Sequence, residues 1–162
     1  MKKYIVVIAL MLGMTINADA RHKKVKIKKS KGITAVTLSR GACFGRCPIY
    51  TLSIKNNGTA VFEGRNATDF LGTYQKQFTP SEVEEIFKRS SDYHVDTLQS
   101  NYVVRISDLP GLDLTFTING KEKNVHNANF GPRFLVNLAE FIDQTVRVDS
   151  TWRKVKDLAP QK

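Results

Sequence analysis

This chain of 162 residues has few cysteines, no apolar run long enough to span a membrane and no familiar catalytic motif, and each absence excludes some classes of protein. The chain has only two cysteines, so it can form at most one internal disulfide. Its one long apolar run, from Tyr4 to Met14, is roughly half of the length that a membrane-spanning helix needs. The chain also lacks a Gly-rich phosphate loop, a serine-hydrolase elbow and a paired-carboxylate motif. No motif therefore commits the sequence to a reaction.

The first 20 residues have the three-part layout of a secretory signal peptide. Lys2 and Lys3 precede the apolar run, and small residues end the segment at Ala20. We expect cleavage after Ala20, since an uncleaved membrane anchor would need a longer run. A lipid anchor on an N-terminal cysteine is not expected, because the first cysteine is Cys43. The sequence thus predicts an exported protein, periplasmic or secreted, with no transmembrane segment after cleavage.

The formal net charge of +10 is concentrated in one short segment. Residues 21–31 form a basic arm, whereas residues 32–162 hold 16 basic and 14 acidic residues. A basic arm attracts anionic polymers or lipid headgroups through its charge alone. This attraction does not depend on nucleotide sequence, so specific nucleic-acid binding is not expected. A solvated N-terminus and an edge strand with outward lysines are the alternatives. The cations of the arm are Arg21, Lys23, Lys24, Lys26, Lys28, Lys29 and Lys31.

Residues 32–150 are expected to form a single domain, followed by a C-terminal tail at 151–162. β-Branched residues and a period of two predict strands at 33–40, 50–55, 59–63 and 73–78. Asn56, Asn57 and Gly58 predict a hairpin turn. Thr79, Pro80 and Glu82 predict a helix start with a capping box.

The second half of the domain repeats this order of elements. Strands are predicted at 102–106, 112–118 and 121–126, with a hairpin turn at Asn119 and Gly120. A second helix is predicted from about Pro132 to Ile142, and Trp152 is expected to close the core. The sequence therefore predicts an α+β fold: an antiparallel sheet of two hairpin-plus-helix halves, with two helices on one face.

The most distinctive stretch runs from Arg40 to Tyr50 and contains both cysteines. In an oxidising compartment, Cys43 and Cys47 in a Gly-rich turn are most simply a disulfide. Two alternatives stay open: a redox-active pair, and a metal site that adds His126 or His94 to the two thiolates, as in copper chaperones of the thioredoxin fold. In those chaperones the motif starts a helix, whereas Pro48 leads into a predicted strand.

At these residues the chain resembles exported bacterial domains of unknown function that share a Gly-x-Cys-x-Gly-x-Cys-Pro-x-Tyr signature. Every fixed position is present, and the resemblance extends over most of the chain beyond the leader. It implies no reaction, cofactor or substrate. The matching residues are Gly41, Cys43, Gly45, Cys47, Pro48 and Tyr50.

His126 is the one candidate for a general base, with an acid such as Asp108 beside it, although a surface histidine is the commoner case. No catalytic residue and no cofactor are assigned. The leading expectation is a small non-catalytic binding or structural module of the bacterial envelope, with an envelope protein or a polyanion as partner. The alternative is a periplasmic thiol-redox or metal-handling protein that uses the cysteine loop, and an enzyme acting on envelope material is a third hypothesis.

Overall fold

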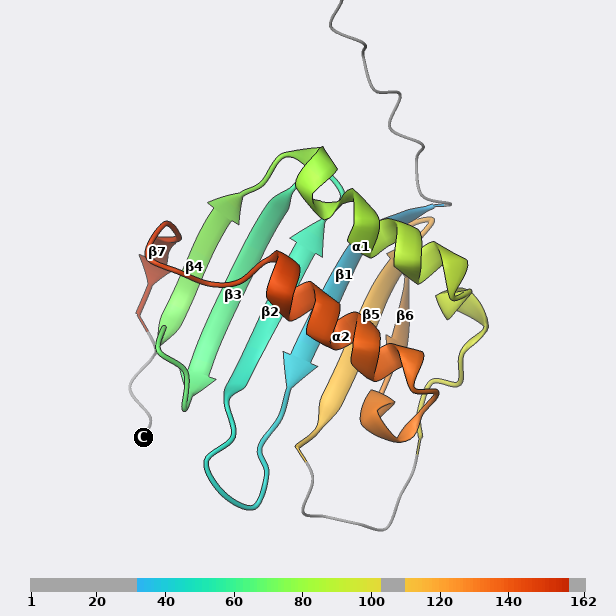
Figure 1. Ribbon diagram of the computed structural model, residues 1–162, viewed down its shortest axis with the longest axis horizontal. Helices are drawn as coiled ribbons and strands as arrows, with labels where there is room; N and C mark the ends of the chain where they lie inside the picture. The colour runs from blue at the N-terminus through green and yellow to red at the C-terminus, as the bar shows by residue number, and fades with distance from the viewer. Residues whose placement is uncertain (1–31, 103–109, 158–162) are drawn as a thin grey trace, which may run out of the picture.

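The computed structural model describes residues 32–102 and 110–157. They form one antiparallel sheet of seven strands in the order β6-β5-β1-β2-β3-β4-β7 (Figure 1). The first strand of the described residues therefore lies in the interior of the sheet. The strands are β1 (Ile33–Arg40), β2 (Ile49–Lys55), β3 (Thr59–Asn66), β4 (Gly72–Gln77), β5 (Leu112–Ile118), β6 (Lys121–Val125) and β7 (Arg153–Lys156).

Two helices cover one face of this sheet, α1 (Pro80–Asp92) and α2 (Phe134–Thr145) (Figure 1). Two short 3-10 helices, η1 (Val95–Thr97) and η2 (Ala128–Phe130), lie in the connections. The core lies between helices and sheet, because alternate residues of the central strands point to the helix side. Its largest fully buried side chains include Leu38, Leu52, Ile54, Ile86, Leu114, Phe116, Leu135, Leu138 and Ile142.

Local signals in the sequence account for most element boundaries. Gly58 has a φ of 87°, and a Cβ at this position would collide with the carbonyl oxygen of Phe78, so the β2–β3 turn needs glycine. At the start of α1, the carboxylate of Glu82 accepts hydrogen bonds from the backbone N–H and the hydroxyl of Thr79, at 2.6 and 2.7 Å. The predicted capping box with Pro80 in the first turn is confirmed.

The structure confirms the α+β class, the antiparallel sheet and the two helices. The arrangement as two hairpin-plus-helix halves is not confirmed: among the described residues four strands precede α1, two lie between α1 and α2, and β7 joins the sheet beside β4. No strand was predicted at β7. The strand predicted at 102–106 lies almost wholly outside the described residues. Trp152 is buried and packs edge-on against Phe78, as expected.

One end of the sheet carries the cysteine loop and the residues around it, and we call it the disulfide end. There β1 stops at Arg40, β2 begins at Ile49, and β5 begins at Leu112, which pairs with Arg40. The β3–β4 loop hangs from the same end, because Ile49 pairs with Asn66. Gly32 lies at the opposite end, where β1 begins. Within the described ranges, no helix has the length and apolarity to cross a membrane.

Candidate functional site

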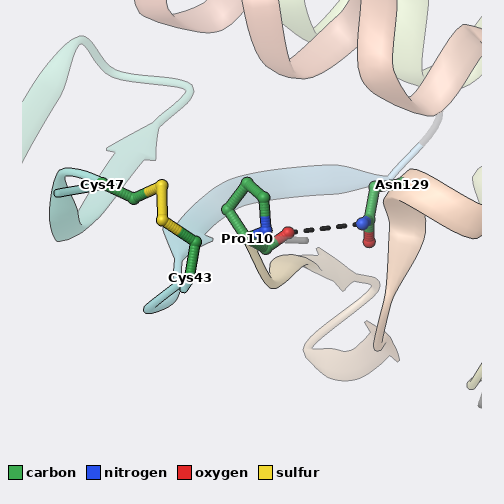
Figure 2. Close-up of a disulfide and its surroundings, with 4 residues drawn as sticks. All are labelled: Cys43, Cys47, Pro110 and Asn129. Atoms are coloured by element: carbon green, nitrogen blue, oxygen red, sulfur yellow. Dashed lines mark hydrogen bonds between the residues drawn. A yellow bond between two sulfur atoms is a disulfide. The ribbon is translucent and has the colours of Figure 1, made fainter. Parts of the chain in front are cut away.

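The cysteine loop, residues 41–48, connects β1 to β2 at the disulfide end. Cys43 and Cys47 form a disulfide, with their Cα atoms 5.8 Å apart (Figure 2). Gly45 has a φ of 146°, and its N–H donates to the carbonyl oxygen of Cys43 at 2.9 Å, a tight turn that glycine permits. The N–H of Gly41 donates to the carbonyl oxygen of Gly111 at 2.8 Å, which fixes the loop to the segment before β5.

The tip of this loop exposes an aromatic side chain. Phe44 is 91% exposed, and Arg46 beside it is also exposed. A single exposed apolar residue is common on protein surfaces. Phe44 is the most exposed large hydrophobic residue in the described part of the chain. The disulfide closes a ring of residues that includes Phe44, so the backbone carrying this side chain is tethered on both sides.

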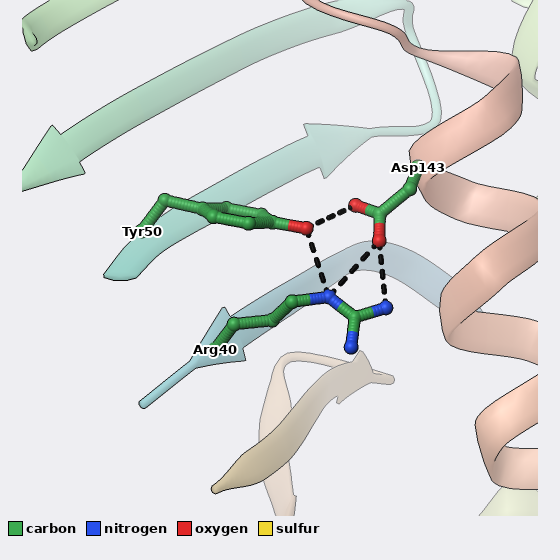
Figure 3. Close-up of polar contacts among 3 residues, drawn as sticks. All are labelled: Arg40, Tyr50 and Asp143. Atoms are coloured by element: carbon green, nitrogen blue, oxygen red, sulfur yellow. Dashed lines mark hydrogen bonds and ion pairs between the residues drawn. The ribbon is translucent and has the colours of Figure 1, made fainter. Parts of the chain in front are cut away.

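Three polar side chains clamp the two stems of the cysteine loop to α2, and we call them the stem clamp (Figure 3). Arg40, the last residue of β1, donates through Nη2 and Nε to Oδ2 of Asp143, at 2.7 and 3.0 Å. The hydroxyl of Tyr50 donates to Oδ1 of Asp143 at 2.6 Å and accepts from Nε of Arg40 at 2.9 Å. Arg40 and Tyr50 are also partners in the β1–β2 register. One carboxylate of α2 therefore binds both strands where the loop begins and ends.

The electrostatics of the stem clamp favour a holding role. Burial raises the pKa of Tyr50 above its ordinary value, and its hydrogen bond to Asp143 raises it further, which outweighs the opposing effect of Arg40. Burial acts to lower the pKa of Arg40, but the Asp143 carboxylate reverses this and the net shift is upward. Tyr50 stays protonated and Arg40 stays charged at neutral pH. The arrangement fixes position and is poorly suited to proton transfer near neutrality.

The signature residues thus have distinct structural roles. Gly45 makes the turn, the cysteines close the loop, and Tyr50 joins the stem clamp. Sequence reasoning placed Tyr50 in the signature but missed its partner Asp143. No local pattern could have shown this contact, because the two residues are 93 positions apart.

His126 lies at the same end of the sheet, but Asp113, which sequence reasoning had not named, is its acidic partner. Nδ1 of His126 is 3.3 Å from Oδ2 of Asp113, and Oδ1 of Asp113 accepts from the backbone N–H of Asn127 at 3.0 Å. Both side chains of the pair are about half exposed. Asp108, the acid proposed from sequence, lies outside the described residues. His94, the other candidate histidine, is exposed at the start of η1.

The described part of the chain contains no set of ligands that would support the metal-site hypothesis. Among those residues, no three His, Cys, Asp or Glu side chains lie close enough together to hold a metal ion. Cys43, Cys47 and His126 are therefore not brought together as ligands. Beside the disulfide, Figure 2 shows Asn129 donating to the carbonyl oxygen of Pro110 at 3.3 Å. This bond ties the segment before β5 to η2.

Comparison with protein families finds a model that matches most of the chain. Residues 34–146, the span from β1 through α2, match the family model described as a domain of unknown function (DUF6438). No curated protein and no solved structure matches the chain. The matched span contains the cysteine loop and all three residues of the stem clamp, whereas β7 and Trp152 lie beyond it.

Proposed function

Because the chain belongs to this family of domains of unknown function, whose description assigns no activity, we propose a function from the geometry of the site. The protein is a small non-catalytic binding module of the bacterial envelope, and its cysteine loop contacts another envelope component. The observation that carries this proposal is Phe44, presented 91% exposed at the tip of a disulfide-braced loop.

Preorganisation makes such a loop suitable for recognition. A flexible loop loses conformational entropy when it binds, whereas a loop held beforehand loses less. Here the disulfide closes the tip, and Asp143 holds the stems through Arg40 and Tyr50. Burying an exposed phenylalanine against a partner contributes about 1.5–3 kcal/mol, so Phe44 would supply much of a modest affinity.

Export is part of the same proposal. The leader at residues 1–20 directs the chain out of the cytoplasm, and an internal disulfide is compatible with an oxidising compartment. The basic arm at 21–31 supplies a separate, salt-dependent attraction to envelope polyanions. The cysteine loop supplies the specific contact.

The test compares retention on isolated bacterial envelopes. Mature protein is sedimented with the envelope fraction at high salt, which suppresses the contribution of the basic arm. We expect Phe44→Ala to reduce the bound fraction about tenfold or more. The matched control is Lys121→Ala, an exposed residue of the β5–β6 hairpin at the opposite end of the sheet. Equal retention of wild type and Phe44→Ala would refute the proposal.

A further inference from the structure

Two asparagines of this chain are followed by glycine, and both pairs lie in hairpin turns at the end of the sheet where β1 begins. Asn57 and Gly58 connect β2 to β3, and Asn119 and Gly120 connect β5 to β6. In such a pair the backbone nitrogen of glycine can attack the carbonyl carbon of the asparagine side chain, because glycine has no Cβ to hinder the approach. Asparagine is for this reason a thermolabile residue. The same reactive pair therefore occurs twice, in two different surroundings.

The β2–β3 turn is tied down by hydrogen bonds. The side-chain oxygen of Asn57 accepts from the backbone N–H of Thr59 at 3.0 Å, and its backbone carbonyl oxygen accepts from Nε2 of Gln77 at 2.8 Å. The N–H of Gly58, which holds the attacking nitrogen, donates to the carbonyl oxygen of Lys55 at 2.9 Å. Gly58 is also buried. Attack on Asn57 therefore requires several of these bonds to break around a buried residue.

The β5–β6 turn is held less firmly. Asn119 and Gly120 are both exposed, and a Cβ placed on Gly120 would meet no atom within 4 Å. The backbone N–H of Asn119 donates to the carbonyl oxygen of Gly32 at 2.7 Å, but within the described ranges the N–H of Gly120 donates to no backbone carbonyl. β6 is also an edge strand of the sheet, so this turn has a neighbouring strand on one side only.

This difference decides which pair reacts first. Ring closure changes the backbone torsions of asparagine, so it takes place in molecules whose turn has opened locally. The fraction of such molecules depends on the local contacts that must break. One or two hydrogen bonds change that fraction by about a factor of ten. The turn that holds Asn119 has fewer of them than the turn that holds Asn57.

We propose that Asn119 is a site of spontaneous deamidation, and that it reacts well before Asn57. The backbone nitrogen of Gly120 forms a bond to Cγ of Asn119, and the side-chain amide leaves as ammonia with the proton from that nitrogen. The product is a cyclic imide. Water then opens the imide at either carbonyl and gives aspartate or isoaspartate. The net reaction is the hydrolysis of one amide, so water is the only co-reactant.

The product alters the place where β1 enters the sheet. Asn119 lies directly against Gly32, since a Cβ on Gly32 would fall 2.0 Å from Oδ1 of Asn119. Aspartate therefore adds a negative charge beside the residue that follows the basic arm. Isoaspartate adds a methylene to the backbone of a turn of two residues, which the pairing of Ile118 with Lys121 does not accommodate. Deamidation thus loosens the β5–β6 hairpin and its contact with the start of β1.

The experiment follows both sites in the same sample. Purified protein is incubated in mildly alkaline buffer, which promotes loss of the proton from the attacking nitrogen, and tryptic peptides are examined by mass spectrometry over time. We expect the peptide with Asn119 to gain the mass increment of deamidation at least about tenfold faster than the peptide with Asn57. Asn119→Gly, which tolerates the positive φ of this position, should abolish that increment. Equal rates in the folded protein, or faster reaction of Asn57, would overturn the inference.

Two further measurements test the role of the fold. In concentrated urea the two sites should react at similar rates, because the protection of Asn57 is lost on unfolding. A preference for Asn119 that persists unchanged in urea would show that flanking sequence, and not the fold, selects the site. Hydrogen exchange should then be faster in β6 of the deamidated protein and unchanged in the β2–β3 hairpin. Unchanged exchange in β6 would refute the loosening of the β5–β6 hairpin.

Discussion

Asp143 holds two strands through one carboxylate, and it is less than one-third exposed. We predict that Asp143→Ala lowers the free energy of unfolding by about 1–3 kcal/mol, because Arg40 and Tyr50 lose their shared acceptor. Urea denaturation measures the change. Asp92→Ala, which removes an exposed ion pair with Lys88 on α1, is the control and should leave the free energy of unfolding nearly unchanged. Equal losses for the two variants would contradict a structural role for the stem clamp.

Tyr50 gives a prediction at alkaline pH. Burial and its hydrogen bond to Asp143 raise its pKa above the usual value of about 10, so the folded state holds the proton longer than the unfolded state. The stability that Tyr50 contributes is therefore fully present below pH ~10 and is lost as pH rises through its folded-state pKa. In ultraviolet titration of the mature chain, which lacks Tyr4, Tyr50 should be the last tyrosine to ionise. Tyr50→Phe should remove that late step, and a late step that survives this substitution would belong to another tyrosine.

Substitutions in the cysteine loop can change local stability without altering the hydrophobic core. We predict that Cys43→Ser with Cys47→Ser lowers stability by about 2 kcal/mol, as expected for a five-residue ring, and leaves the sheet intact. Trypsin should then cleave after Arg46 much faster than in wild type, which mass spectrometry of the fragments would show. The rate of cleavage after Arg65, an exposed site in β3, is the internal control and should not change. Unchanged cleavage after Arg46 would mean that the disulfide does not restrain the loop.

At the level of elements, the sequence predicted the features that are determined by residues close together in the chain. Strands with a period of two, the turn at Gly58 and the capping box at Thr79 each leave a local pattern, and all are present. β7 left no such pattern, because all four of its residues are exposed and it pairs with a strand about 80 positions earlier. The stem clamp was hidden for the same reason: Tyr50 and Asp143 meet only after the sheet and α2 have packed.

At the scale of the whole molecule, the point where the basic arm joins the sheet and the start of the cysteine loop lie at opposite ends of β1. The arm leads into Gly32 at one end of the sheet, and the loop begins after Arg40 at the other. We predict that deleting residues 21–31 and replacing Phe44 by alanine weaken envelope binding independently, because distant sites act additively. Salt titration of binding measures both: the deletion should flatten the salt dependence, while Phe44→Ala should lower affinity at every salt concentration. Strong coupling between the two changes would argue for one shared contact surface.

The pairing of β1 with β5 has a consequence for how the chain reaches this structure. β1 occupies the interior of the sheet, yet one of its neighbours is made of residues about 80 positions later, since Ile33 pairs with Ile118. Pairing β1 with β5 requires closure of a long loop, and this closure costs conformational entropy before most of the stabilising contacts have formed. Synthesis or transit of the first hundred residues therefore leaves one side of β1 open. The native sheet can form only after β5 has been synthesised or exported. We therefore expect the pairing of β1 with β5 to be the slow step of folding.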